Sequence, residues 1–184
     1  LSGFSNSVIW LIFAAFMFAL GYKKTGLGKR VSLVMIKYMG KSSLGLGYAV
    51  AFSDLVLSPF MPSNTARSAG TIYPVASNIP LIFDSTPEHE PRKLGAYISW
   101  VAIATTCVTS SMFLTALAPN LLAVDLITKS TGHAISWVEW SSVMLPLMIP
   151  LFLLTPWLTY IVYPPTQKKS PEAPAWATEE LKTL

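Results

Sequence analysis

Two long apolar runs meet at the short polar sequence Pro62-Ser63-Asn64-Thr65, and this junction constrains the fold more than any other feature. The runs cover residues 43–61 and 66–83. A proline beside three small hydrogen-bonding side chains interrupts a helix, and at membrane depth such backbone is tolerated only inside protein or along a cavity. Broken helices of transporters turn free amide groups toward anions and free carbonyls toward cations. The junction therefore predicts an interrupted helical pair that could bind an anion. The alternative from the residues alone is a simple connecting loop between two full spans.

The composition favours a membrane protein. Hydrophobic residues make up 52% of the chain and charged residues 12%, whereas a soluble domain averages about 25% charged residues. The net charge of +4 does not indicate nucleic acid, because the basic residues fall in the connections between apolar runs. The single cysteine, Cys107, cannot form an internal disulfide.

The order of apolar and polar segments predicts an all-α polytopic membrane protein. An apolar run and a basic amphipathic helix at the cytoplasmic interface should be followed by the interrupted pair, a polar loop, a second broken helix, a connection, a proline-containing span and a solvated linker. These segments correspond to residues 1–42, 43–83, 84–94, 95–124, 125–141, 142–165 and 166–184.

The basic residues give the orientation of the chain in the membrane. Six lie between residues 23 and 41 and two at 92–93, whereas the connection at 125–141 holds only Lys129. Cytoplasmic connections carry the excess of Lys and Arg. The loop at 84–94 and the tail at 166–184 are therefore expected to be cytoplasmic, and the connection at 125–141 external.

A second polar interruption lies between residues 105 and 120. Small hydroxyl side chains in membrane helices most often serve packing, but Thr115 followed by Pro119 and Asn120 predicts unwound backbone. Two broken segments in one short chain indicate a transport site.

Asp54 and Arg67 are ionisable residues within these apolar segments, which makes them candidates for a functional site. Arg67 could attract a dicarboxylate or form an ion pair with Asp54, and we favour a structural or steering role over direct ligation. The two histidines, His89 and His133, have no partners at metal-ligand spacing. The sequence predicts no enzyme motif, no metal site and no cofactor.

Four blocks of the sequence closely resemble the divalent anion:sodium symporter (DASS) family, and the resemblance covers essentially the whole chain. It is closest to the branch of bacterial citrate/succinate and tartrate/succinate antiporters and plastid 2-oxoglutarate/malate translocators. Because the chain begins without Met and ends in mid-pattern, we expect a fragment from the N-terminal half of such a carrier. The blocks are LSGFSN with WLIFAAFMFALGYKKTGLGKR, then PSNTARSAGTIYP, SSMFLTALAPN, and IVYPP with SPEAP.

The resemblance implies part of an inverted-repeat elevator transporter. Residues 1–42 would then belong to a scaffold, and residues 43–83 would be a re-entrant hairpin of the transport domain. Ser63, Asn64 and Thr65 would form the hairpin tip and contact a substrate carboxylate. Thr115, Pro119 and Asn120, in the broken helix, would complete this half of the site. A second hairpin would come from the other half of the carrier, which would be a homodimer in the lipid bilayer of the bacterial cytoplasmic (inner) membrane, or alternatively of the plastid inner envelope.

Two departures from the sodium-coupled members of that family favour anion exchange. Pro59 stands four residues before Ser63, where such members can offer a hydroxyl, and residues 109–113 lack the glycines of their broken helix. A sodium site near Ser63 and Asn64 is therefore doubtful. We expect exchange of di- and tricarboxylates such as succinate, citrate, tartrate and malate. The alternatives are a sodium-coupled dicarboxylate symporter, and less strongly a membrane-embedded enzyme or a structural membrane subunit.

Overall fold

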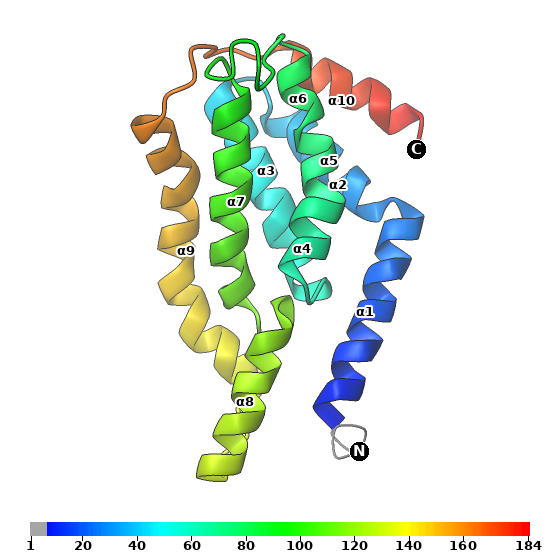
Figure 1. Cartoon of the computed structure of the whole chain (residues 1–184), viewed down its shortest axis with the longest axis vertical. Coiled ribbons are helices and arrows are strands. Elements are labelled where there is room, and N and C mark those ends of the chain that lie inside the picture. Colours follow the sequence, from blue (N-terminus) through cyan, green and yellow to red (C-terminus); the bar gives the residue numbers. More distant parts are fainter. Residues whose placement is uncertain (1–6) are drawn as a thin grey trace.

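The computed structural model describes residues 7–184, which form an elongated bundle of helices (Figure 1). Over this range the structure contains no β-strand, only an isolated bridge between Ser42 and Lys169. The fold is therefore all-helical, as the sequence predicts. The elements are α1 Ser7–Thr25, α2 Leu27–Met39, α3 Ser43–Leu57, η2 Ser58–Phe60, α4 Asn64–Arg67, η3 Ser68–Ile72, α5 Tyr73–Ala76, α6 Asn78–Leu81, α7 Gly95–Met112, η4 Leu114–Ala116, α8 Ala118–Thr131, α9 Trp137–Val162 and α10 Glu172–Lys182.

The first interruption separates two helical arms. The first arm is α3, whose N-terminus is capped by the Ser42 hydroxyl, continued by the short turn η2. The helical backbone stops at Met61, which is extended, and Pro62 has no N–H to continue it. The second arm is a stack of short helical pieces from α4 to α6, including the π-helical segment η3. Figure 1 shows this stack rising from the break to the end of the bundle that carries α10.

The second interruption separates α7 from α8. Helix α7 packs against α3 and α9, whereas α8 extends past the end of α7 in Figure 1 and has no fully buried residue. Helix α8 continues to Thr131 and α9 begins at Trp137. The connection between these two helices is therefore shorter than the predicted 125–141. Gly132 ends α8 in the left-handed conformation, with a φ of 74°, and a capping box of Ser136 and Glu139 starts α9.

The C-terminal tail differs from the solvated linker that its charge and prolines predict. Helix α10 packs against α2 with Ala173 and Ala177 completely buried, and Lys29 Nζ lies 2.9 Å from Glu180 Oε2. Because these alanines are four residues apart, they lie on one face of the helix. The average composition of the tail hides this small apolar face.

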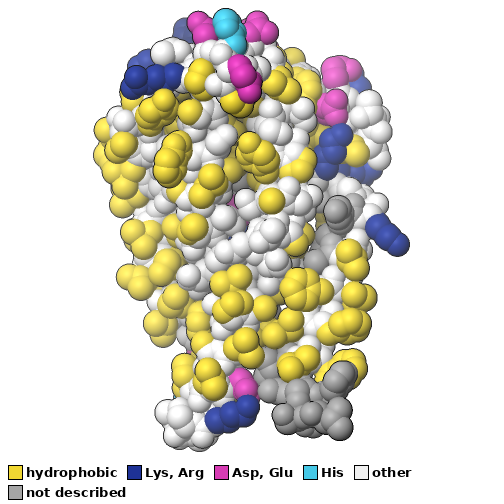
Figure 2. Space-filling model, in the orientation of Figure 1, with side chains coloured by type: hydrophobic (Ala, Val, Ile, Leu, Met, Phe, Trp, Pro, Cys, Tyr) yellow, Lys and Arg dark blue, Asp and Glu magenta, His cyan; other side chains and the backbone are white. Residues whose placement is uncertain are grey.

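Polar and apolar side chains occupy different levels of the bundle. On the face shown in Figure 2, charged side chains lie at the two ends and along the right-hand edge down to about mid-height, and hydrophobic ones are spread over the rest. Two segments of the described chain, Ser43–Phe60 and Trp137–Val162, are long and apolar enough to cross a membrane. Large apolar side chains such as Trp100 and Val143 are exposed on the sides. This distribution is expected of a protein whose sides face lipid or further protein rather than water.

Candidate functional site

The two helix interruptions lie against each other. The backbone N–H of Ala118 donates to the carbonyl of Pro62 at 3.1 Å, and the Thr115 hydroxyl donates to the carbonyl of Pro59 at 2.7 Å. Each interruption thus satisfies polar backbone that the other leaves free. Residues 56 positions apart in the sequence meet in one irregular region inside a helical bundle.

The three residues of the proposed tip have different environments. The Ser63 hydroxyl accepts from the backbone N–H of Ala66 at 3.3 Å and caps the start of α4. Asn64 Oδ1 accepts from the Ser110 hydroxyl at 2.5 Å, which ties the tip to α7. The Thr65 side chain is exposed. The tip therefore has two anchored polar side chains and one that faces outward.

Arg67 is the centre of the region. Its side chain is fully buried, and its Nε lies 2.9 Å from Asp54 Oδ1. The second carboxylate oxygen of Asp54 accepts from the Thr109 hydroxyl. Of the two roles considered for Arg67, the structure contains the ion pair with Asp54. The pair leaves this buried region with no net charge from its side chains.

The guanidinium group also joins both interruptions. Arg67 Nη1 donates to the carbonyl of Met61 at 3.0 Å and to that of Ala116 at 3.1 Å. Its Nη2 lies 3.2 to 3.3 Å from three hydroxyl groups of α7, those of Thr106, Thr109 and Ser110. Carbonyl and hydroxyl oxygens of this kind are the ligands that a small metal cation would use. Here a positively charged side chain occupies them.

Asn120 holds the second interruption, and α8 begins directly after it at Ala118, with Pro119 as the second helical residue. Asn120 Nδ2 donates to the carbonyls of Ser110 at 2.8 Å and Phe113 at 3.2 Å. The Pro119 side chain is exposed, in the first turn of α8, where a missing N–H costs no helical hydrogen bond. All the residues proposed from the sequence therefore lie in or beside the two interruptions.

Sequence reasoning missed two groups of residues in this region. The first is the set of hydroxyl groups of Thr106, Thr109 and Ser110, which were expected to serve helix packing and instead surround Arg67. Their spacing of three and four residues on one helix face could have identified them. The second is the pair Trp137 and Trp140, whose indoles donate to the second interruption. No local sequence signal relates these tryptophans to residues more than 20 positions away.

Comparisons with known proteins give a consistent result. The family described as "Sodium:sulfate symporter transmembrane region" matches residues 1–184. The L-tartrate/succinate antiporter of Escherichia coli K12 is 55% identical over 185 residues, covering 100% of this chain and 38% of that protein. The proteins of the same name from E. coli O6:H1 strain CFT073 and from Shigella flexneri are 53% and 55% identical, with the same coverage. The chain therefore spans 38% of the length of these relatives.

Proposed function

The chain belongs to the divalent anion:sodium symporter (DASS) family, and from this membership we propose that the protein exchanges di- and tricarboxylates across a membrane. The similar proteins of known function are transporters and not enzymes. Their name, L-tartrate/succinate antiporter, supports succinate and tartrate as substrates. Citrate and malate are chemically close, because each presents at least two carboxylates on a short carbon chain.

The observation that carries this proposal is the meeting of the two interruptions around Ser63, Asn64 and Thr65. Irregular backbone inside an apolar bundle is costly unless it is satisfied or lines a cavity. In our proposal Ser63, Asn64 and the exposed Thr65 replace water around one substrate carboxylate at the tip of a re-entrant hairpin. Thr115, Pro119 and Asn120 shape the opposite side of this half-site. The far carboxylate would meet a second hairpin elsewhere in the full-length protein.

The position of Arg67 supports exchange without sodium. A sodium ion beside the tip would use backbone carbonyls and hydroxyls freed by the breaks. Two such carbonyls, from Met61 and Ala116, already accept hydrogen bonds from Arg67. A mobile cation there would lose these ligands and be repelled by the fixed positive charge. The alternative remains a sodium-coupled symporter with its ion at a different place.

The exchange mechanism follows from the difference between an empty tip and a tip that holds a substrate anion. An empty tip presents exposed polar groups such as the Thr65 hydroxyl, which makes its movement through an apolar environment unfavourable. A bound dianion satisfies those groups and permits an elevator movement of the hairpin and α7 against the scaffold. The full-length carrier would act as a homodimer in the bacterial inner membrane. Since the empty carrier crosses poorly, each inward passage of substrate requires an outward passage.

Uptake of labelled succinate into liposomes that contain the full-length protein tests this proposal. Vesicles preloaded with unlabelled succinate or tartrate are compared with empty ones, each with and without a sodium gradient. We expect uptake only in preloaded vesicles and no effect of sodium. Uptake into empty vesicles driven by sodium would make the protein a symporter. Lack of uptake under every condition would favour a structural membrane subunit.

A further inference from the structure

We propose that Trp137 and Trp140, at the start of α9, are positioning residues of the anion site and hold the unwound residues 113–117 in their working conformation. This inference rests on the proposed function and goes further, because it concerns residues outside both interruptions. Their indole nitrogens each donate to the second interruption or to the end of α7 beside it. Trp137 is also packed against a side chain of the unwound segment.

Trp140 replaces a hydrogen bond that the break removes. Helix α7 ends at Met112, so the carbonyl of Ser111 has no regular helical partner at Thr115. Trp140 Nε1 donates to that carbonyl at 3.1 Å. Asn120 does the same for the carbonyl of Ser110. Trp140 and Asn120 thus donate to carbonyl groups at the end of α7 that would otherwise be unsatisfied in an apolar environment.

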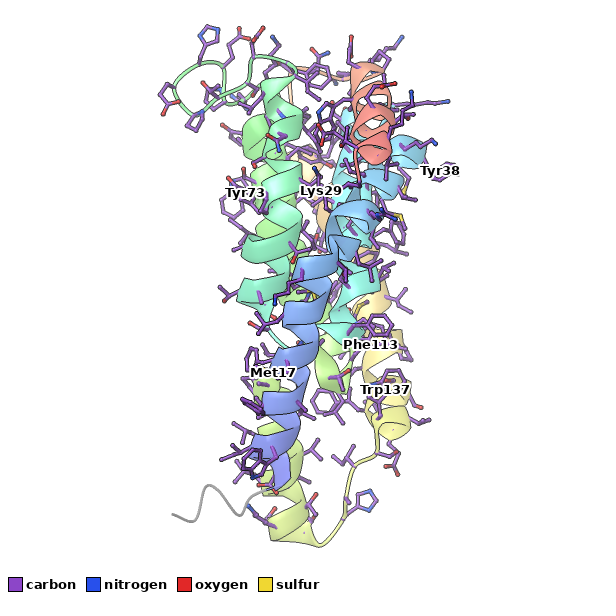
Figure 3. All side chains as sticks on the ribbon, turned by 90° about the vertical axis from the view of Figure 1, so that its right-hand side faces the viewer. Met17, Lys29, Tyr38, Tyr73, Phe113 and Trp137 are labelled. Carbon is purple, nitrogen blue, oxygen red and sulfur yellow. The ribbon has the colours of Figure 1, made fainter. Side chains whose placement is uncertain are left out.

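Trp137 fixes the segment through a ring contact and a hydrogen bond. Its indole is stacked on Phe113, with ring centroids 5.9 Å apart and an angle of 16° between the planes. Figure 3 shows these two labelled side chains close to each other. The Trp137 Nε1 lies 3.3 Å from Thr115 Oγ1. The segment is therefore held at two places, residues 113 and 115, by one rigid side chain.

These contacts also determine the direction of the Thr115 hydroxyl. An indole nitrogen can only donate, so Thr115 accepts from Trp137 and gives its own proton to the carbonyl of Pro59. A relay of two hydrogen bonds then runs from α9 through the second interruption to the first. With its proton used in this way, Thr115 has no donor left for a carboxylate. Its contribution to anion binding is to fix the geometry of the two interruptions.

Helix α9 is suited to be the fixed side of this contact. Its first turn is stabilised by the capping box of Ser136 and Glu139, directly beside Trp137. The helix packs along α7 and α3, and the Tyr97 hydroxyl of α7 donates to the Pro156 carbonyl at its other end. Since both ends of α9 are held against the bundle, the indoles of Trp137 and Trp140 can hold residues 113–117 in one position.

The test uses the full-length carrier in liposomes with preloaded succinate and measures exchange kinetics of Trp137→Phe and Trp140→Phe. Each change keeps an aromatic ring and removes the N–H. We expect KM for succinate to rise about tenfold, the loss that follows when a hydrogen bond to an otherwise unsatisfied group is removed, while Vmax per assembled carrier stays within about twofold. The matched control is Trp157→Phe on the same helix, whose ring is 45% exposed and lies away from both interruptions; its KM should not change.

A double-mutant cycle distinguishes positioning from general stabilisation of the fold. If Trp137 acts through the Thr115 hydroxyl, adding Trp137→Phe to Thr115→Val should raise KM by less than about twofold beyond Thr115→Val alone. Independent, multiplicative effects of the two changes would overturn the relay. If Trp137→Phe reduces the amount of assembled carrier, Trp137→Tyr is measured in the same cycle against the same criterion. Tyrosine provides a ring that is larger and more polar than that of phenylalanine.

The outcomes separate this inference from the function on which it rests. Exchange by the wild-type carrier, together with an unchanged KM in both tryptophan variants, would overturn the inference alone. Lack of exchange by the wild-type carrier would overturn the proposed function and the inference together. A raised KM confined to Trp137→Phe and Trp140→Phe is the result that we expect.

Discussion

Arg67 Nε lies 2.9 Å from Asp54 Oδ1 in a place where both side chains are almost completely buried. The two residues are 13 positions apart, on opposite sides of the first interruption. Their ion pair therefore holds together the two arms that Pro62 separates. Since burying an unpaired charge is far more costly than burying a pair, this contact makes each arm depend on the other.

The first prediction concerns the removal of the Asp54 charge. Asp54→Asn should destabilise the folded protein by about 3 kcal/mol, because it leaves the Arg67 charge buried without a counter-charge. Thermal unfolding in detergent measures this loss. The control is Asp125→Asn, which breaks an ion pair with the largely exposed Lys129 and should cost less than about 1 kcal/mol. Equal unfolding midpoints for the two variants would contradict the prediction.

A second prediction separates the stability of this region from its function. The double variant Asp54→Leu with Arg67→Met removes both charges and should recover most of the stability lost in Asp54→Asn, because apolar side chains of similar size can replace a buried ion pair. The hydrogen bonds of Arg67 to Met61 and Ala116 are lost as well. We therefore expect a folded carrier with impaired succinate exchange. Full exchange activity in this variant would show that the guanidinium is dispensable.

The third prediction addresses the proposed tip. Ser63→Ala and Asn64→Ala in the full-length protein should each reduce exchange about 10- to 100-fold, because each removes a hydrogen bond to a charged carboxylate, while insertion into the membrane is unaffected. Asn78→Ala is the matched control. Asn78 lies in the same arm, is exposed and donates to the nearby Pro74 carbonyl. If exchange by Asn64→Ala equals that of Asn78→Ala, the tip has no role in binding.

The sequence predicts the helical fold and both interruptions because these depend on local properties. Proline at position 62 and the polar residues after it stop one helix, and the same logic places a break before Pro119. The contacts between the interruptions depend instead on the way α3, α7 and α9 pack. No spacing in the sequence brings Trp140 to Ser111 or Arg67 to Ala116. For the same reason the two possible roles of Arg67 could be stated from the sequence but not decided.

Boundaries were less predictable than the elements themselves. The tail was expected to be a linker because its charges and prolines dominate the average, yet two buried alanines are sufficient to seat α10 on α2. Helix α8 extends to Thr131 because no helix-breaking residue precedes Gly132 after Pro119. In both cases a few small residues determine the structure, and composition over a window cannot show them.

A fourth prediction tests the close packing of α3 against α7. A methyl group at Gly47 would lie 2.1 Å from the hydroxyl oxygen of Tyr97, and that tyrosine is buried and hydrogen-bonded to Pro156. Gly47→Ala should therefore destabilise the protein by about 1 to 3 kcal/mol, as measured by thermal unfolding. Adding Tyr97→Phe should recover part of the loss. Gly21→Ala, where the methyl group meets nothing within 4 Å, should leave stability unchanged or slightly improved.

The last prediction decides what holds α10 in place. Both a buried apolar face and the ion pair of Lys29 with Glu180 join this helix to α2, but the pair is partly exposed, at 41% and 35%, and should contribute less than about 1 kcal/mol. Ala177 is completely buried, so Ala177→Leu should overpack the contact at a cost of about 1 to 3 kcal/mol. Limited proteolysis of the tail measures the detachment of α10.

Two matched variants complete this comparison. Ala175→Leu introduces the same side chain at an exposed position of the same helix and should leave the rate of tail cleavage unchanged. Glu180→Gln removes the ion pair and should raise that rate only slightly. If Glu180→Gln releases the tail more readily than Ala177→Leu, electrostatic attraction rather than packing holds α10. The expected order, with Ala177→Leu the most sensitive, follows from the difference between a dry contact and a solvated one.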